Sequence, residues 1–111
     1  MQINQEEKNG ILVYYLNGEI DINTSPQVKK IIDKAIAAKK DKILLNFKDV
    51  SYIDSSGLAT LVEVLKGLRS YGGKLAISNL SVKVKNLFEI TKLEKLFNIS
   101  SEEEEAVKSL I

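Results

Sequence analysis

The hydrophobic and polar pattern of the first residues predicts a β-hairpin. Residues 11–16, ILVYYL, are rich in β-branched and aromatic side chains, which are typical of strands. They follow Asn9-Gly10, a dipeptide typical of tight hairpin turns, so residues 2–7 are expected to pair with them antiparallel. Asn17-Gly18 predicts a second turn directly after this strand.

Two short, continuously apolar segments predict strands that are covered on both faces, as parallel strands usually are. They are KILLNFK at residues 42–48 and KLAIS at residues 74–78. A helix-like segment lies between them, and a strand–helix–strand unit of this length implies a right-handed parallel crossover. LFNI at residues 96–99 is expected to form a short edge strand.

Apolar residues at helical spacing predict the helices. Ser25 is expected to cap the first, with Pro26 at its first helical position and its end near Lys39. DVSYIDSSG, residues 49–57, is expected to connect a strand to the second helix, which residues 71–73, YGG, bring to an end. The apolar stripes of the first three helices are Val28, Ile31, Ile32, Ala35 and Ile36; Leu58, Leu61, Val62, Leu65 and Leu68; and Val84, Leu87 and Phe88.

The last two helices are marked by their expected caps. Ser81 caps the third, and Ser101 with Glu104 has the spacing of a capping box for the fourth. Residues 102–105, all Glu, lie at the positive end of that helix dipole and are expected to be solvated. The order of elements predicts a single α/β domain over residues 1–111: a small, mostly parallel sheet of four or five strands, an N-terminal antiparallel hairpin and about four helices.

Composition excludes several classes of function. The chain of 111 residues has no histidine and no cysteine, which excludes Cys/His zinc sites and Ser-His-Asp nucleophiles. Its 16 basic and 15 acidic side chains leave a net charge of +1, without the basic excess that favours nucleic acid. No apolar run approaches the roughly 20 residues that span a bilayer, and the first residues are unlike a signal peptide. We expect a cytoplasmic protein with no metal, cofactor, nucleic-acid or membrane partner.

The segment DSSG, residues 54–57, separates a predicted strand from a predicted helix and allows two interpretations. In the first, Asp54 or Ser55 is an ordinary N-cap that accepts a backbone N–H. In the second, a hydroxyl receives a phosphate, because the free N–H groups at a helix start favour an anion. Gly57 favours the second, since glycine in the first turn costs about 1 kcal/mol relative to alanine. A cap does not require that glycine, whereas the approach of a partner backbone or a nucleotide does.

This segment also carries a family resemblance. DVSYIDSSGLATL, residues 49–61, resembles the signature of anti-sigma factor antagonists, the single-domain bacterial STAS proteins. GEID at residues 18–21 and the segment at residues 71–93 resemble two further family features, so the likeness covers nearly the whole chain. One departure is Ala59, where the family often has glycine. The family fold is a four- or five-stranded sheet with helices mainly on one side.

The resemblance implies a phosphorylation switch. The unphosphorylated protein would bind a serine-kinase anti-sigma factor and release the sigma factor. Phosphorylation of Ser55, with Ser56 as the fallback position, would break that complex, and a PP2C-type phosphatase would restore it. Asp54 would present the hydroxyl, Gly57 would allow close docking, and Asp21 would lie at the rim of the same surface. The expected partner-binding residues are Asp21, Asp54, Ser56, Gly57 and Leu58.

Two other functions compete with this switch. The chain would be an interaction-only STAS module of a transporter or signalling complex if the corner docks but is never modified. It would be an enzyme if Ser55 were a nucleophile beside Asp54, but adjacent residues point in different directions and no histidine can act as base. We therefore expect a non-enzymatic regulator with no catalytic residue, monomeric while unbound.

Overall fold

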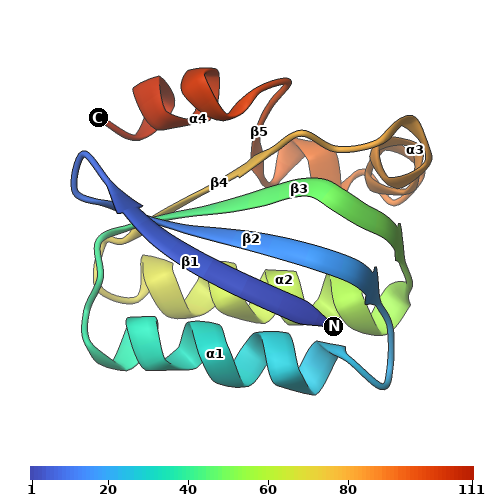
Figure 1. Cartoon of the computed structure of the whole chain (residues 1–111), viewed down its shortest axis with the longest axis horizontal. Coiled ribbons are helices and arrows are strands. Elements are labelled where there is room, and N and C mark those ends of the chain that lie inside the picture. The colour runs from blue at the N-terminus through green and yellow to red at the C-terminus, as the bar shows by residue number, and fades with distance from the viewer.

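A five-stranded mixed sheet forms the centre of the molecule in a computed structural model that describes residues 1–111 (Figure 1). The strands lie in the order β1-β2-β3-β4-β5, with β1 antiparallel to β2 and all other neighbours parallel. Their bounds are β1 Gln2–Lys8, β2 Ile11–Ile20, β3 Lys42–Ile53, β4 Lys74–Ser78 and β5 Asn98–Ser100. This arrangement confirms the predicted mostly parallel sheet with its N-terminal hairpin.

Four α-helices cover the sheet, as predicted. They are α1 Ser25–Ala37, α2 Ser55–Arg69, α3 Val82–Ile90 and α4 Glu103–Leu110, and a short 3-10 helix, η1 Leu93–Lys95, precedes β5. Helices α1 and α2 lie side by side on one face of the sheet, and α4 lies on the opposite face (Figure 1). The core beneath α1 and α2 also contains Val84 and Phe88 of α3, so only α4 stands on the other side.

The two faces of the sheet bury different cores. Along β2, Tyr14 and Leu16 point into the larger cluster with α1 and α2, whereas Ile11 and Val13 point to α4. This alternation follows from the two-residue repeat of a strand. Burial on both faces explains why the apolar segments of the parallel strands are continuous.

The N-terminal hairpin forms at the predicted turn. Asn9 and Gly10 both adopt positive φ angles, 52° and 77°. Two residues with positive φ match the right-handed twist of the flanking strands, and Asn-Gly tolerates this conformation best. The pairing then runs from Lys8 with Ile11 to Gln2 with Asn17.

The predicted turn at Asn17-Gly18 is wrong. Strand β2 continues through both residues to Ile20, and Gly18 has a φ of 125° inside it. The register with β3 is irregular at this point, because Tyr15 pairs with Asn46 but Asn17 pairs with Asp49. The glycine therefore marks a bulged region of the sheet, which sequence alone does not distinguish from a turn.

The predicted connector at residues 49–57 is also shorter than expected. Residues 49–53 extend β3, and Ile53 pairs with Ile20 at the end of β2. Only Asp54 separates β3 from α2. The helix start therefore lies directly against the carboxyl end of the neighbouring strand.

Two predicted caps are wrong. The N-cap of α1 is Thr24, so Ser25 and Pro26 are the first two helical residues. The N-cap of α4 is Glu102, which makes no side-chain cap, so the box of Ser101 and Glu104 does not form. By contrast, the predicted cap of α3 is confirmed, because the Ser81 hydroxyl accepts the Val84 N–H at 3.2 Å.

One acid of the predicted solvated run is half-buried and bonded within the chain. Glu103 keeps only 19% of its side chain exposed and accepts hydrogen bonds from Lys8 Nζ at 2.6 Å and Asn46 Nδ2 at 3.0 Å. Burial alone would raise the pKa of Glu103, but the hydrogen bonds from Lys8 and Asn46, with the nearby Tyr15 hydroxyl, together lower it. This carboxylate fixes the start of α4 to the sheet.

Candidate functional site

The start of α2 is organised by one carboxylate. Asp54 is the N-cap, with an extended backbone (φ −105°, ψ −174°), and its Oδ1 accepts the Gly57 N–H at 3.0 Å. The same Oδ1 accepts the Ser56 hydroxyl at 2.6 Å. The capping interpretation of DSSG is therefore confirmed for Asp54.

Asp54 also joins the β2–α1 loop to the start of α2 at the carboxyl end of the sheet. Its Oδ2 accepts the N–H of Ile22 at 3.2 Å, and its own N–H donates to the Ile20 carbonyl at 3.1 Å. The hydrogen bond from the Ser56 hydroxyl is the main cause that lowers the pKa of Asp54, followed by that from the Gly57 N–H. An ionised Asp54 thus holds the β2–α1 loop against the first turn of α2.

The two serines have different environments. Ser55 is the first residue of α2, is exposed, and its hydroxyl makes no hydrogen bond within the chain. Ser56 is half-buried, and its hydroxyl is committed to Asp54. A transfer to Ser56 would have to break that bond, whereas Ser55 is directly accessible.

Gly57 has an internal reason to be glycine. A Cβ at this position would lie 2.6 Å from Ile53 Cγ1 and 2.8 Å from both Ile20 Cγ2 and the Ile20 carbonyl oxygen. The close approach is that of the chain's own strands, so this glycine no longer argues for a docked partner or nucleotide. Leu58 follows it into the core, with 7% of its surface exposed.

Asp21 lies in the loop that Asp54 binds. Its Oδ1 accepts the N–H groups of Asn23 at 2.9 Å and Thr24 at 3.1 Å, a local turn that leads into α1. The structure thus brings Asp21, Asp54, Ser55 and Ser56 together at the carboxyl ends of β2 and β3. In open α/β sheets, binding sites gather at the carboxyl ends of the strands.

Comparison with known proteins places the chain in a family. The model of the STAS domain matches residues 2–106. The chain belongs to the STAS domain family.

Two relatives of this STAS domain are named as anti-sigma factor antagonists. It is 37% identical over 105 residues to the anti-sigma-B factor antagonist of Bacillus subtilis (strain 168), and the match covers 94% of each chain. It is 32% identical over 111 residues to the anti-sigma F factor antagonist of Paenibacillus polymyxa, with 99% of this chain and 95% of that one covered. Among solved structures, it is similar to the Bacillus cell fate determinant SpoIIAA in its phosphorylated form, with a TM-score of 0.75, 25% identity and coverage of 99% and 100%.

The STAS domain also exposes apolar side chains that sequence reasoning missed. Ile22, in the loop bound by Asp54, is 72% exposed, and Val82, the first residue of α3, is 77% exposed. Beside Val82, the Lys83 ammonium lies 5.3 Å from the centre of the Tyr52 ring near the end of β3. The signal for Ile22 was an apolar residue within the otherwise polar loop DINTSP.

No group of three or more acidic side chains in the structure is arranged to hold a metal ion. None of the helices combines the length and the apolar character that a bilayer crossing requires.

Proposed function

We propose that the protein is an anti-sigma factor antagonist that binds a serine-kinase anti-sigma factor and is switched off by phosphorylation of Ser55. In its unmodified form it occupies the anti-sigma factor, which releases the sigma factor. A PP2C-type phosphatase removes the phosphate and restores binding. The whole cycle takes place in the cytoplasm.

The accessible hydroxyl of Ser55 carries this proposal. It stands at the first position of α2, free of any internal bond, while the neighbouring hydroxyl of Ser56 is held by Asp54. A phosphate on Ser55 would meet the positive end of the helix dipole, so the fold can accept it. The sequence relationship to two anti-sigma factor antagonists supports the same conclusion.

The charge change acts on a docked partner. A phosphate adds about −1.5 to −2 charges at pH 7. Asp54 is ionised beside it, and Asp21 lies in the adjoining loop, so the local negative charge becomes high. A partner surface that fits the uncharged hydroxyl and packs on Ile22 would be repelled electrostatically, without any change in the domain's own core.

In this proposal Ser55 is not a catalytic nucleophile. Asp54, the nearest carboxylate in sequence, is bonded to Ser56, Gly57 and Ile22 and not to the Ser55 hydroxyl. A nucleophilic serine needs a general base within hydrogen-bond reach. Ser55 is therefore a substrate for a partner kinase in this proposal, and the chain itself is a binding protein.

Incubation with the serine-kinase anti-sigma factor of the same organism and ATP tests the proposal. We expect wild type to gain the mass of one phosphoryl group, mapped to Ser55 by peptide fragmentation. Ser56→Ala is the matched control and should still be labelled, whereas Ser55→Ala should not. Absence of label on wild type, with a kinase shown to be active on another substrate, would contradict the switch.

Two further variants separate the switch from an interaction-only STAS module. If the corner is a phosphorylation switch, Ser55→Asp should weaken binding of the anti-sigma factor. If it only docks, Ser55→Asp should leave the affinity unchanged, while the bulky Ser55→Trp abolishes binding. Binding measured by calorimetry distinguishes the two.

A further inference from the structure

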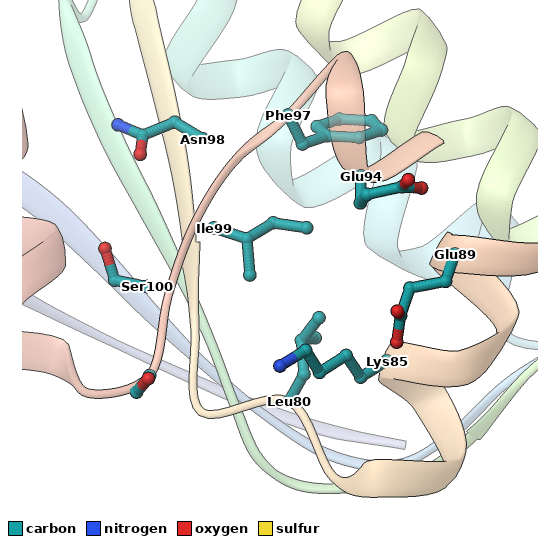
Figure 2. Close-up of a pocket in the computed structure, with 9 residues that line it drawn as sticks. Leu80, Lys85, Glu89, Glu94, Phe97, Asn98, Ile99 and Ser100 are labelled. Atoms are coloured by element: carbon teal, nitrogen blue, oxygen red, sulfur yellow. The ribbon is translucent and has the colours of Figure 1, made fainter. Parts of the chain in front are cut away.

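A cavity of about 540 Å³ lies between strand β5 and helix α3 (Figure 2). None of its lining residues belongs to α2 or to the β2–α1 loop. Its apolar part comes from Leu80, Phe97 and Ile99. Lys85 and Glu89 of α3 and Glu94 of η1 supply the charged groups.

The cavity runs along the free edge of the sheet. Strand β5 is the last in the strand order and has β4 as its only neighbour. Figure 2 shows Ile99 pointing into the cavity, whereas Asn98 and Ser100 point to the other side of the strand. All three nevertheless line the cavity. Successive strand residues face opposite sides, so a cavity that touches all of them must reach the backbone edge of the strand.

The backbone groups of Ile99 point to this free edge. The carbonyl of Ser100 accepts the N–H of Asn79 at 3.3 Å, so Ser100 faces the β4 side. The N–H and C=O groups of neighbouring strand residues point to opposite edges, and those of Ile99 therefore face outward. A donor and an acceptor in this position are a template for one more strand.

The two edges of the sheet differ in their protection. β1, at the other edge, carries Glu6, Glu7 and Lys8, and such charges deter strand addition. β5 has the sequence NIS and carries no charge. The feature of β5 that disfavours strand addition is its short length of three residues. The exposed edge beside the cavity is thus the one open to a partner strand.

The charges of the cavity specify the partner. Glu94 Oε2 is buried and has no hydrogen-bond partner. Neither Glu89 nor Glu94 belongs to an ion pair, and Lys85 is the one cation among the lining residues and is also unpaired. With two carboxylates and one ammonium the lining carries a net negative charge, which favours a basic side chain of a partner.

We propose that this cavity binds an extended segment of a partner protein by strand addition to β5. The segment carries an apolar side chain that packs on Leu80 and Ile99, which are partly exposed, and a Lys or Arg two positions away on the same face that pairs with the Glu94 carboxylate. Strand addition supplies main-chain hydrogen bonds, and alternate side chains supply specificity. The docking site is separate from Ser55, so a partner could remain attached in both phosphorylation states.

Titration of the full chain with synthetic peptides, followed by amide NMR, tests this proposal. In the probe peptide, Val and Arg stand two positions apart on one face of the strand, and Thr occupies the positions of the other face. The control peptide has Glu in place of Arg. With the Arg peptide, but not with the Glu peptide, we expect chemical-shift changes and slower amide hydrogen exchange at Ile99 and Ser101. Glu94→Gln, which keeps the shape and removes the charge, should weaken binding about tenfold, the size of a lost charge-assisted hydrogen bond. Glu105→Gln, on the exposed side of α4, is the control and should bind as wild type does.

Ile99→Pro tests the backbone contact. It removes the outward N–H, which proline tolerates at an edge strand, and should abolish binding while the amide spectrum stays folded. No binding of either peptide, or equal binding of the Glu peptide, would overturn the proposal. Shifts at Asn98–Ser100 that depend on protein concentration, without any peptide, would overturn it in favour of a second copy of the chain. Unchanged affinity in Glu94→Gln, a variant expected to fold, would overturn the role of the basic side chain.

Discussion

The Oγ of Ser56 lies 2.6 Å from Oδ1 of Asp54, and this hydrogen bond distinguishes two adjacent serines. It holds one hydroxyl within the cap of α2 and leaves the Ser55 hydroxyl facing solvent. A negative charge at the first position of a helix is favourable, whereas a negative charge against the capping carboxylate is not. The consequences differ for stability, docking and pH dependence.

Substitution by aspartate should affect thermal stability differently at the two serine positions. Ser55→Asp places a charge at the start of α2 and should leave the melting temperature unchanged or slightly raised. Ser56→Asp forces its carboxylate against Asp54 and should lower the melting temperature. Thermal unfolding of both variants in one buffer checks this. A large loss of stability in Ser55→Asp would show that this side chain is not free.

Removal of the hydroxyls should give the same ranking. Ser56→Ala loses a hydrogen bond to an ionised acceptor and should lower the free energy of unfolding measurably. Ser55→Ala removes an exposed, unbonded hydroxyl and should stay within about 0.5 kcal/mol of wild type. Urea denaturation measures both. The reverse order would contradict the assigned hydrogen bond.

Gly57 should resist substitution for reasons of packing. Gly57→Ala puts a methyl group 2.6 Å from Ile53 Cγ1 and 2.8 Å from the Ile20 backbone. Such overpacking costs about 1–3 kcal/mol, more than the roughly 1 kcal/mol that alanine gains in a helix. Gly67→Ala is the matched control in the same helix, because its nearest neighbour is the flexible end of Ile36 at 3.1 Å. We expect urea denaturation to find Gly57→Ala destabilised and Gly67→Ala near wild type; equal stabilities would be inconsistent with the close approach.

The cap should be sensitive to acid. The folded-state pKa of Asp54 is below its ordinary value because the Ser56 hydroxyl and the Gly57 N–H donate to the ionised form. The unfolded chain titrates near pH 4, so this stabilisation is complete above about pH 4 and is lost as the pH falls through the folded value. The stability difference between wild type and Asp54→Asn should therefore shrink below that pH. Denaturation curves across the acid range measure it, and a difference independent of pH would exclude an ionised cap.

The anchor of α4 should depend on one glutamate of the acidic run. Glu103→Gln leaves an amide against the Lys8 ammonium and should lower the melting temperature, and α4 should gain amide exchange. Glu105→Gln, on the exposed side of the same helix, should change little. Equal effects of the two substitutions would mean that the contacts of Glu103 with Lys8 and Asn46 contribute nothing.

Local patterns predicted most of the fold. The hairpin followed from Asn9-Gly10, whose positive φ angles are a local property, and β4 at residues 74–78 followed from a short apolar run. The errors arose where distant residues decide the structure. Gly18 has the signature of a turn, but pairing with β3 keeps it in the strand. Ser101 and Glu104 have the spacing of a cap, but Glu103 bonds instead to Lys8, 95 positions earlier in the chain.

The candidate site was located by its motif, and its details needed coordinates. The sequence placed Asp54 and Ser55 at a helix start, and the structure confirms both positions. The residues alone did not show which serine has a free hydroxyl, and the preference for Ser55 came from the family resemblance. Side-chain geometry decides which hydroxyl bonds to the capping carboxylate. Sequence reasoning also assigned Gly57 to a partner, since the approach of Ile20 depends on the pairing of β2 with β3.

The most direct test is a calorimetric titration of the serine-kinase anti-sigma factor with the unmodified protein and with the same protein phosphorylated on Ser55. We expect binding by the unmodified form and at least a tenfold loss of affinity, about 1.4 kcal/mol, for the phosphorylated form. The melting temperatures of the two forms should agree, because the phosphate sits at a helix start outside the core. Equal affinity of both forms for the anti-sigma factor would contradict the switch.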